Sequence, residues 1–508
     1  MNENKEKLEL AHLKLSQIMS HRLQKLGRLK QLGVNPYPYN FKRTEYSTNI
    51  LDEPNKYLGK EVSVSGRLMA IRGHGKVCFG HVMDSKGRIQ IYVRKDRIGD
   101  KNFEVFNLLD IGDIIGVSGE VFETRTGETT IKAAKIELLS KTLRPLPIVK
   151  EKQEGDEKVV YDQFADKELR YRQRYVDLVV NPEVRDVFVI RSKIISSMRH
   201  YLDGKGFLEV ETPVLQPIYG GASARPFVTH HHTLDMELYL RIADELYLKR
   251  LIVGGYDGVY EISKDFRNEG MDRFHNPEFT MMELYVAFED YHWMMSLVEE
   301  MISSIAKEVT GDMKISNQDR EIDLTPPWKR ITLFDAIEEY TAKNLYGKGL
   351  EDLKKAAKDL HIEVEPSWRE GKIIDEIFSE KVEPNLIQPT FVTDYPLELS
   401  PLAKKHRDDP KLVERFEPFI LGGEIGNAYS ELNDPLDQRE RFMAQKKLIE
   451  LGDEAAHVLD EDFLRSLEYG MPPTTGLGIG IDRLVMLFTD QPSIRDVIFF
   501  PQMRPEDK

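Results

Sequence analysis

Five short runs of alternating apolar residues between residues 61 and 140 constrain the fold of this chain more than any other feature. Glycine or charged turns separate the runs, which cover residues 62–66, 77–82, 88–93, 114–117 and 129–132. A period of two residues is typical of strands with one buried face. Because a barrel removes the exposed edges of a sheet, we predict that these strands close into a small β-barrel.

Five strands in about eighty residues suit an OB-fold, whose open face binds single-stranded nucleic acid by stacking and backbone contacts. Phe79 and Gln90 fall on strands of that face, where a ring can stack on a base and an amide can hydrogen-bond to one. Taken singly, the two residues are more typical of a barrel core and rim. We predict an OB-fold over residues 61–145.

The first thirty residues have the periodicity of an amphipathic helix. Apolar residues recur at three- and four-residue steps from Leu8 to Leu29, and the helix is predicted to end near Gly33. Residues 1–43 contain nine Lys or Arg against three Glu. Such a face is typical of a backbone contact with nucleic acid or of a solvated helix, and the charge pattern leaves both open. We assign residues 1–60 to this helix and its lead-in.

The whole chain is acidic, since 71 Lys and Arg stand against 86 Asp and Glu and give a net charge of −15. Any contact with nucleic acid must therefore rest on local basic patches and be sensitive to salt. The single cysteine, Cys78, can form neither an internal disulfide nor a cysteine metal site, which favours a reducing compartment. Since the sequence has no apolar stretch of about 20 residues and no secretory signal, we expect a cytoplasmic protein.

A boundary follows the barrel, because residues 144–147 are stiffened by proline and the charged run from Lys150 to Lys158 lacks apolar periodicity. We assign residues 146–170 to a linker. Residues 171–508 mix amphipathic helical patterns with strand-like runs, which predicts an α+β catalytic domain. The strand-like runs are residues 238–242, 258–262 and 280–286.

Three elements occur in fixed order within residues 171–508. The first is a helix over residues 193–203, a glycine turn and a strand over residues 207–213 that ends in proline. The second, residues 266–283, crowds cation, carboxylate, imidazole and aromatic side chains together. The third, residues 476–488, is a glycine-rich strand that runs into a helix. Its glycines do not follow the G-x-G-x-x-G pattern, so we do not expect a dinucleotide-binding fold.

The second and third elements contain the groups that hold a nucleotide. Arg267 can grip a phosphate at two points, Phe279 offers an apolar face to a purine, and Glu269 can accept an exocyclic amine. Closely spaced glycines let a ligand approach a strand backbone, and Arg483 at the start of the following helix can reach a terminal phosphate. These residues predict a nucleotide-binding site.

With these elements the sequence resembles the class II aminoacyl-tRNA synthetases, whose three motifs they match, and most closely the lysyl-tRNA synthetases. The resemblance runs from about residue 22 to 505, and the linker is longer than the family's usual connector. It includes residues 171–175, 220–227, 424–427, 430–434 and 495–498.

The resemblance implies a two-step reaction in which lysine is activated by ATP and then esterified to tRNA. Arg267 would stabilise charge on the α-phosphoryl group and Arg483 would hold the γ-phosphate, so both are expected to be catalytic. Phe279 would stack on adenine. The family's Mg²⁺ carboxylates correspond to Glu417 and Glu424. The expected ATP site consists of Arg267, Glu269, His275, Asn276, Phe279, Glu417, Glu424 and Arg483.

The lysine site implied by the resemblance is acidic, as an ammonium substrate requires. Aspartyl and asparaginyl synthetases share the architecture but need cations or amide donors there. The resemblance also implies tRNA(Lys) as partner, anticodon contacts from Phe79, Gln90 and Glu137, and a homodimer through residues near 193–213. The lysine-site residues are Gly221, Glu245, Glu283, Tyr285, Asn427, Tyr429 and Glu431.

Other functions predict features that differ from those of this sequence. A relative that lysylates a protein would lack the N-terminal domain, and a catalytically idle paralogue would be expected to lose Arg267, Glu424 or Arg483. A covalent nucleotidyltransferase would carry a K-x-D-G motif, which this sequence lacks. The triplet at residues 230–232 is all histidine, but neighbours on a strand point to opposite faces, so we do not predict a three-histidine metal site.

Overall fold

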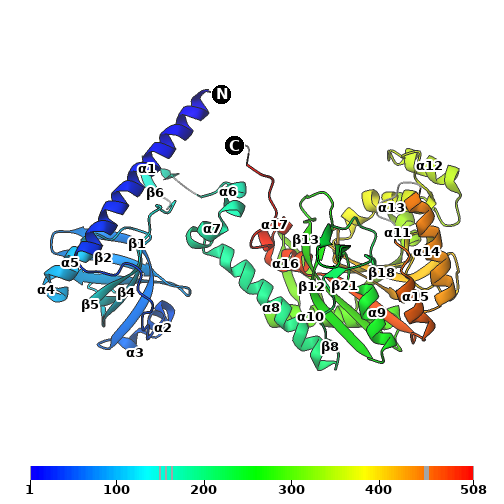
Figure 1. The fold of residues 1–508 in the computed structure, drawn as a ribbon, viewed down its shortest axis with the longest axis horizontal. Helices are drawn as coiled ribbons and strands as arrows, with labels where there is room; N and C mark the ends of the chain where they lie inside the picture. The colour runs from blue at the N-terminus through cyan, green and yellow to red at the C-terminus, as the bar shows by residue number, and fades with distance from the viewer. Residues whose placement is uncertain (1, 148–149, 155–156, 162–163, 451–456, 507–508) are drawn as a thin grey trace. The chain divides into compact units, whose positions relative to one another are not determined.

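The computed structural model describes residues 2–147, 150–154, 157–161, 164–450 and 457–506. The chain divides into two compact units, Met1–Ala165 and Asp166–Lys508. We call them the barrel unit and the sheet unit; they contain the blue and the green-to-red elements of Figure 1, respectively.

The barrel unit is built on five strands that close in the order β1-β2-β3-β5-β4. All five strands expected from the alternating pattern are present, so the predicted OB-type barrel is confirmed. Buried side chains alternate with more exposed ones along β2 and β3, as a closed barrel requires. The strands are β1 (Glu61–His74), β2 (Val77–Met83), β3 (Arg88–Arg94), β4 (Ile114–Glu123) and β5 (Thr129–Ser140).

Short helices complete the barrel unit. They are α2 (Ser47–Asp52), α3 (Pro54–Tyr57), α4 (Lys95–Ile98) and α5 (Asp100–Asn107). The segment predicted as a linker also contains a two-stranded antiparallel sheet, β6 (Lys150–Glu154) and β7 (Glu157–Tyr161). Sequence reasoning missed this hairpin because its strands are charged and lack the apolar alternation that marks a half-buried strand.

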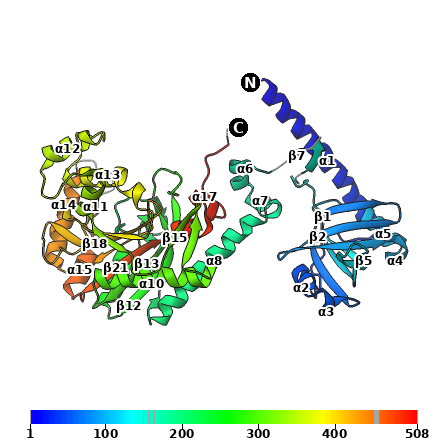
Figure 2. The ribbon, with the colours of Figure 1, turned by 180° about the vertical axis from the view of Figure 1, so that it is seen from behind.

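The predicted N-terminal helix is α1 (Asn2–Gln31), and its C-terminal part packs on the barrel (Figure 2). Leu29 is fully buried in the barrel core. The Arg22 guanidinium donates hydrogen bonds to the Ile111 carbonyl at 3.0 Å and to Thr142 Oγ1 at 2.9 Å. Lys25 Nζ lies 2.7 Å from Asp110. These basic side chains therefore stabilise the barrel unit itself, a role that the charge pattern did not predict.

A nine-stranded sheet forms the centre of the sheet unit, in the order β16-β17-β18-β20-β21-β13-β12-β8 with β19 paired to β18. Its central strands are antiparallel, and the predicted α+β class is confirmed. The strands are β8 (Leu208–Glu209), β12 (Gly258–Phe266), β13 (Glu278–Ala287), β16 (Lys329–Thr332), β17 (Thr390–Pro396), β18 (Leu412–Ile420), β19 (Gly423–Glu424), β20 (Gly426–Ser430) and β21 (Thr474–Gly480).

Helices α8 (Glu183–Gly204), α10 (Tyr291–Thr310) and α16 (Ile481–Thr489) cover one face of this sheet (Figure 1). Met282 and Leu284 of β13 belong to the core that these helices complete, whereas their strand neighbours Met281 and Glu283 line a cavity. Successive side chains on a strand point to opposite faces. Since Met282 and Leu284 point towards the helices, Met281 and Glu283 must point to the other face, into the cavity.

The first predicted motif differs from expectation in extent. The helix expected over residues 193–203 is the longer α8, and the strand expected over residues 207–213 is reduced to β8, which pairs in parallel with β12. The remaining elements are α6 (Lys167–Arg172), α7 (Arg174–Val180), β9 (Leu215–Gln216), β10 (Val228–His231), β11 (Met236–Leu240), α9 (Glu245–Val253), β14 (Lys314–Asn317), β15 (Arg320–Asp323), α11 (Leu333–Thr341), α12 (Leu350–Asp359), α13 (Glu370–Lys381), η1 (Glu383–Asn385), η2 (Leu397–Leu399), α14 (Pro435–Glu450), α15 (Glu461–Glu468) and α17 (Ile494–Val497).

Candidate active site

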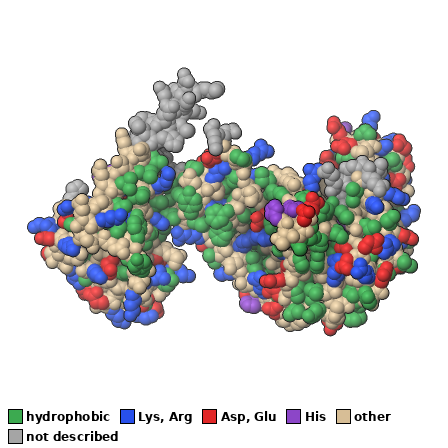
Figure 3. Space-filling view, in the orientation of Figure 1, with side chains coloured by type: hydrophobic (Ala, Val, Ile, Leu, Met, Phe, Trp, Pro, Cys, Tyr) green, Lys and Arg blue, Asp and Glu red, His purple; other side chains and the backbone are tan. Residues whose placement is uncertain are grey.

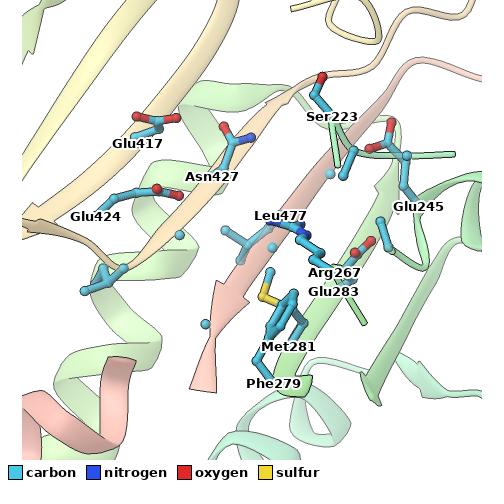
Figure 4. Close-up of a pocket in the computed structure, with 18 of the residues that line it drawn as sticks. Ser223, Glu245, Arg267, Phe279, Met281, Glu283, Glu417, Glu424, Asn427 and Leu477 are labelled. Atoms are coloured by element: carbon cyan, nitrogen blue, oxygen red, sulfur yellow. The ribbon is translucent and has the colours of Figure 1, made fainter. Parts of the chain in front are cut away.

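A cavity of about 570 Å³ opens on the face of the nine-stranded sheet opposite α8 and α10. It brings together side chains from β13, β18, β20 and β21, with Ser223 and Glu245 at one side and Glu417 and Glu424 at another (Figure 4). Its size suits a small-molecule site. All residues of the expected ATP site and six of the seven of the expected lysine site line it, Glu431 being the exception.

Arg267 and Phe279 lie next to each other in the cavity, because β12 and β13 pair Asp265 with Phe279 and the Arg267 amide continues this pairing with a hydrogen bond to the Pro277 carbonyl at 2.9 Å. The Arg267 guanidinium carbon lies 5.0 Å from the centre of the Phe279 ring. The cation–π contact holds the guanidinium and the ring together, at the place where a phosphate and the purine ring of the ligand are expected to bind. Glu269 lies exposed at the cavity edge.

His275 connects the second motif to the third. Its Nδ1 lies 2.8 Å from Asp272, and its Nε2 lies 3.3 Å from Nη2 of Arg483. If Nδ1 carries the proton and donates it to Asp272, Nε2 accepts from the guanidinium. Asn276 is buried, and its Nδ2 donates to the Glu278 carbonyl at 2.6 Å. The two residues therefore shape the loop that holds the nucleotide-binding groups.

Arg483 lies in the first turn of α16, directly after the glycine-rich strand β21. Asp482 fixes this turn, since its Oδ2 accepts from the Thr280 amide at 2.7 Å and its Oδ1 lies 2.6 Å from Nη1 of Arg191. Arg483 Nη1 donates to the Glu424 carbonyl at 2.8 Å. The start of α16 is therefore connected by these contacts to β13, to α8 and to β19, which carries Glu424.

Glu417 and Glu424 come from adjacent strands, β18 and β19, and lie on the same side of the cavity (Figure 4). Tyr395 donates a hydrogen bond to Glu417 at 2.7 Å, and Arg415 forms an ion pair with it. Burial, followed by the charge of Glu424, raises the pKa of Glu417 to about 7 although Arg415 opposes this. The two carboxylates repel each other, and a hard divalent cation such as Mg²⁺, which prefers oxygen ligands, would relieve this repulsion by binding to both.

Glu283 occupies the opposite side of the cavity, on β13. Its Oε2 accepts from the Tyr285 hydroxyl at 3.0 Å and its Oε1 from the Asp244 amide at 3.1 Å. Burial, with added repulsion from Asp244 and Asp265, raises the pKa of Glu283 well above its ordinary value. A cationic ligand would offset these charges, so this end of the cavity favours an ammonium group.

Glu245 lies near Glu283 at the start of α9, and its Oε2 accepts from the Tyr429 hydroxyl at 2.6 Å. Gly221 has a φ of +90°, and a Cβ there would lie 3.0 Å from the Glu245 side chain. Glycine is therefore required both by the backbone and by the close approach. Asn427 lines the cavity and accepts from Arg415 Nε at 2.9 Å.

Glu431 is fully buried and does not itself line the cavity, although it lies on the cavity face of the sheet. A Cβ on Gly476 would overlap Glu431 Oε1, and Gly476 is paired with the cavity residues Tyr285 and Tyr429, so its Cβ direction is towards the cavity. The ion-pair partner of Glu431 is Lys249, which also lies 2.5 Å from Glu245. The Glu431 carboxylate is therefore connected to the cavity through Lys249 and Glu245.

Sequence reasoning missed several residues of the site. Lys249 follows Glu245 by four residues on α9, a spacing that signals an ion pair on a helix. Arg415 precedes Glu417 by two residues on β18, which places both on one face of the strand. The cavity residues Tyr395 and His457 carry no comparable local signal.

The barrel unit carries the three residues expected to contact an anticodon. The centre of the Phe79 ring lies 4.9 Å from that of Tyr92, tilted by 41°, and the Tyr92 ring lies 5.8 Å from Phe122, so three half-buried rings form a row on the outside of the barrel. Gln90 accepts from Thr130 Oγ1 at 2.9 Å.

Glu137 is the third residue expected to contact the anticodon. It lies on β5 and forms an ion pair with Lys135 at 2.8 Å.

The chain matches two families over most of its length. Residues 166–504 match the tRNA synthetases class II (D, K and N), and residues 62–139 match an OB-fold nucleic acid binding domain. A lysine–tRNA ligase of Carboxydothermus hydrogenoformans is 54% identical over 98% of this chain and 100% of its own. Those of Christiangramia forsetii and Thermoanaerobacter pseudethanolicus are also 54% identical, over 97% of this chain and 87% and 97% of theirs.

The chain belongs to the lysine–tRNA ligase family of class II tRNA synthetases. The family and enzyme class expected from the three motifs are thus confirmed, together with the OB-fold and the class II catalytic fold. In this lysine–tRNA ligase family member, no helix among the described residues is long and apolar enough to cross a membrane.

Proposed function

We propose that this chain activates L-lysine with ATP and transfers it to tRNA(Lys), in the cytoplasm, as a homodimer that uses Mg²⁺. The observation that carries this proposal is that one cavity holds the carboxylates of Glu283 and Glu245 on one side, the adjoining pair of Arg267 and Phe279, and the carboxylates of Glu417 and Glu424 on the other side. Glu283 and Glu245 form an acidic end that suits the ammonium groups of lysine, and Arg267 with Phe279 suits the phosphate and adenine of ATP.

In the first step, a lysine carboxylate oxygen attacks the α-phosphorus of ATP. A new oxygen–phosphorus bond forms, the bond to the β-phosphate oxygen breaks, and pyrophosphate leaves. Arg267 stabilises the charge that develops on the α-phosphoryl oxygens, and Arg483 holds the γ-phosphate. Phe279 stacks on adenine, with Glu269, His275 and Asn276 around it.

Glu417 and Glu424 would hold Mg²⁺, which neutralises phosphate charge when bound. Arg415 and Tyr395 position Glu417 by an ion pair and a hydrogen bond. The mutual repulsion of the two carboxylates supports this assignment, because a cation between them removes it.

In the second step, a hydroxyl of the terminal ribose of tRNA attacks the lysyl carbonyl. An ester forms, AMP leaves and the hydroxyl proton goes to solvent. We assign residues 171–508 to this chemistry, residues 146–170 to a linker and residues 61–145 to anticodon binding. The ring row at Phe79 supports the last assignment, since stacked aromatics are typical of single-strand recognition by OB-folds.

The homodimer is proposed through α8 and the chain near it. Val189 on α8 and Phe499 near the C-terminus are 51% and 46% exposed, and the Phe188 and Phe499 rings stack at 3.7 Å. Hydrophobic side chains also gather over α6 and α7 (Figure 3). Apolar side chains exposed together in this way support a self-complementary contact. Light scattering of the full chain should give the dimer mass, and a monomer at working concentration contradicts this part of the proposal.

The function is tested by ATP–pyrophosphate exchange with each of the twenty amino acids and ornithine, followed by charging of total tRNA. We expect exchange with lysine and charging of one tRNA species. Exchange without charging would favour a protein-lysylating enzyme, and the absence of exchange with any amino acid would contradict the proposal.

A further inference from the structure

Arg415 is a largely buried cation in the wall of the cavity. It lies on β18, and its side chain is 16% exposed. Its Nη1 donates to Ser400 Oγ at 2.9 Å and to the Leu399 carbonyl at 3.3 Å, and its Nη2 forms the ion pair with Glu417. The guanidinium carbon lies 4.6 Å from the centre of the Tyr395 ring. These contacts come from several directions and hold the guanidinium plane in one orientation.

The Nε of Arg415 reaches Asn427 on the neighbouring strand β20. Strands β18 and β20 pair Arg415 with Tyr429, so Asn427 lies diagonally across from Arg415, within reach of a long side chain. Nε donates to Asn427 Oδ1 at 2.9 Å. Because a guanidinium has donors and no acceptor, the amide must turn its oxygen towards it. Arg415 therefore decides which way round the Asn427 amide lies.

The amide nitrogen of Asn427 consequently faces the cavity. Among the described residues, none accepts a hydrogen bond from this Nδ2. Figure 4 shows the nitrogen on the side of the amide turned towards Ser223, and the oxygen on the side turned towards Glu417. Nδ2 thus offers its N–H groups to a ligand, and an acceptor with negative charge forms the strongest hydrogen bonds with them.

Asn427 and Glu283 lie in one row across the sheet. The strand between them, β21, pairs Gly478 with Asn427 on one side and with Glu283 on the other. Gly478 lines the cavity, and a Cβ there would lie 4.0 Å from the Glu283 side chain. Two strand spacings of about 4.8 Å separate the two outer backbones, so the carboxylate and the amide donor face the same small space. An α-amino acid carries an ammonium group for the first and a carboxylate for the second.

We propose that Arg415 is a positioning residue for the amino-acid substrate: it holds the Asn427 amide with the oxygen turned towards the guanidinium, so that Nδ2 donates to the substrate carboxylate. This inference rests on the proposed function, since it takes lysine as the substrate. The same guanidinium forms an ion pair with Glu417. One side chain therefore arranges both the amide that orients the attacking carboxylate and a carboxylate expected at Mg²⁺.

The first test compares lysine with lysinol, in which a hydroxymethyl group replaces the carboxylate. Binding to the full chain is measured by isothermal titration calorimetry without ATP and Mg²⁺, so that no metal at Glu417 contributes. R415M keeps the apolar stem and removes the donors. We expect its Kd for lysine to rise about tenfold or more and its Kd for lysinol to change by less than about threefold. Equal losses for the two ligands would overturn the proposal.

A double-variant cycle tests whether Arg415 acts through Asn427. N427A removes the amide donor, and we expect its Kd for lysine to rise about tenfold. Since R415M is expected to act through the same amide, R415M/N427A should bind lysine as N427A does. Additive losses, about a hundredfold in the double variant, would show that Arg415 acts by another route and would overturn the proposal.

N427D tests the orientation of the amide with Arg415 in place, so its result does not depend on the folding of any Arg415 variant. The new carboxylate accepts from Nε with one oxygen and turns the other, which has no proton, towards the cavity. We expect Kd for lysine to rise about tenfold or more, because an anionic acceptor replaces the donor that faces the substrate carboxylate. Lysine binding that is unchanged or tighter in N427D would place an oxygen there in the unaltered chain and overturn the proposal.

R415K separates charge from orientation. Lysine keeps the positive charge, but one ammonium group cannot contact Glu417 and Asn427 in the two directions that a planar guanidinium reaches. We therefore expect Kd for lysine to rise about tenfold in R415K as well. A Kd equal to that of the unaltered chain would show that the charge alone is sufficient, which overturns the orienting role.

The matched control is R407M, which removes a cation from the other face of β18. Arg407 forms an ion pair with Glu414, the chain neighbour of Arg415, and lies 2.8 Å from Asp290. Neither Arg407 nor Glu414 lines the cavity. R407M should bind lysine and lysinol as the unaltered chain does. A rise in Kd for lysine equal to that of R415M would overturn the proposal.

Failure of the proposed function and failure of this inference give different results. Absence of lysine binding and of lysine-dependent exchange in the unaltered chain contradicts the function. Normal lysine binding by the unaltered chain and by R407M, with unchanged Kd for lysine in R415M and N427D, contradicts only the role of Arg415.

Discussion

Arg483 donates a hydrogen bond from Nη1 to the main-chain carbonyl of Glu424 at 2.8 Å, and the same nitrogen lies 3.3 Å from the Glu424 carboxylate. The two residues are 59 positions apart in the sequence. These contacts attach the first turn of helix α16 to strand β19, which carries the proposed metal ligand Glu424. A cation expected at the γ-phosphate and a carboxylate expected at Mg²⁺ are held in one arrangement before ATP binds, which is the condition for preorganised electrostatic catalysis.

Replacement of Arg483 by lysine tests this arrangement. Lysine keeps the charge, but a single ammonium cannot contact the Glu424 carbonyl, His275 and a phosphate as a planar guanidinium does. We expect kcat/KM for ATP in pyrophosphate exchange to fall by about tenfold or more, with KM for lysine little changed. Arg273→Lys is the control, because Arg273 is exposed and its guanidinium donates to the Pro492 carbonyl at 3.3 Å. Equal losses in both variants would contradict the role.

Glu283→Gln tests the acidic end of the cavity. Loss of a buried carboxylate that pairs with an ammonium costs about 2–5 kcal/mol, so KM for lysine should rise about thirtyfold or more while ATP binding stays nearly intact. Glu278→Gln is the matched control on the same strand, because Glu278 is half-exposed and lies 3.7 Å from Lys264. Unchanged lysine kinetics in Glu283→Gln would contradict the proposal that this end of the cavity binds lysine.

Glu424→Gln tests the proposed metal site. Removal of one of two charged oxygen donors weakens Mg²⁺ binding, so the Mg²⁺ concentration for half-maximal exchange should rise about tenfold. The control is Glu380→Gln, a substitution on α13 at a surface ion pair with Lys381. The measurement is exchange against Mg²⁺ concentration at saturating lysine, and identical curves for Glu424→Gln and the unaltered chain would contradict the assignment.

Phe79→Ala separates the two units functionally. Loss of one stacking ring is expected to lower kcat/KM for tRNA by about fivefold to a hundredfold, since stacking on one base contributes about 1–3 kcal/mol. Exchange without tRNA should be unchanged, because Phe79 belongs to the barrel unit and the cavity to the sheet unit. Tyr37→Phe is the control within the barrel unit; it removes only a hydrogen bond to the Lys141 carbonyl. Equal charging by Phe79→Ala and the unaltered chain would remove Phe79 from the tRNA site.

The sequence was sufficient for elements that carry a local pattern. Alternation predicted all five barrel strands, and the glycine-rich run predicted β21 and the start of α16. It was insufficient where long-range contact decides the structure. Glu245 and Tyr429 are 184 positions apart, so their hydrogen bond cannot be read from spacing. The same holds for Glu431, which matches a lysine-site position by motif and whose contact with Gly476 bridges 45 positions of the sequence, so that its assignment to the lysine site stays a prediction.

The extent of α8 shows a second limit. The helix was predicted to start at residue 193 but begins at Glu183, directly after its N-cap residue Pro182. The short β8 shows the reverse case: residues 207–213 have strand propensity, but only Leu208–Glu209 pair with β12. Strand length is therefore set by the neighbouring strand and not by the residues themselves.

Asp244 gives a prediction on stability and pH. Burial, with repulsion from Asp265, raises the pKa of Asp244 to about 8, whereas an unfolded aspartate titrates near pH 4. Between these values the folded chain holds a proton that the unfolded chain has released. This contribution to the free energy of unfolding is therefore complete below about pH 4 and is lost as the pH rises to about 8, by up to about 1.4 kcal/mol per pH unit.

Asp244→Asn removes this titration, so the free energy of unfolding of the variant should fall less than that of the unaltered chain between pH 5 and pH 8. Tryptophan fluorescence in guanidinium reports the sheet unit alone, because all three tryptophans, Trp293, Trp328 and Trp368, belong to it. Asp235→Asn is the control, since the Asp235 side chain is 94% exposed. Parallel pH profiles for the unaltered chain and Asp244→Asn would show that Asp244 is ionised in the folded chain, and that Arg241, 3.0 Å away, outweighs burial.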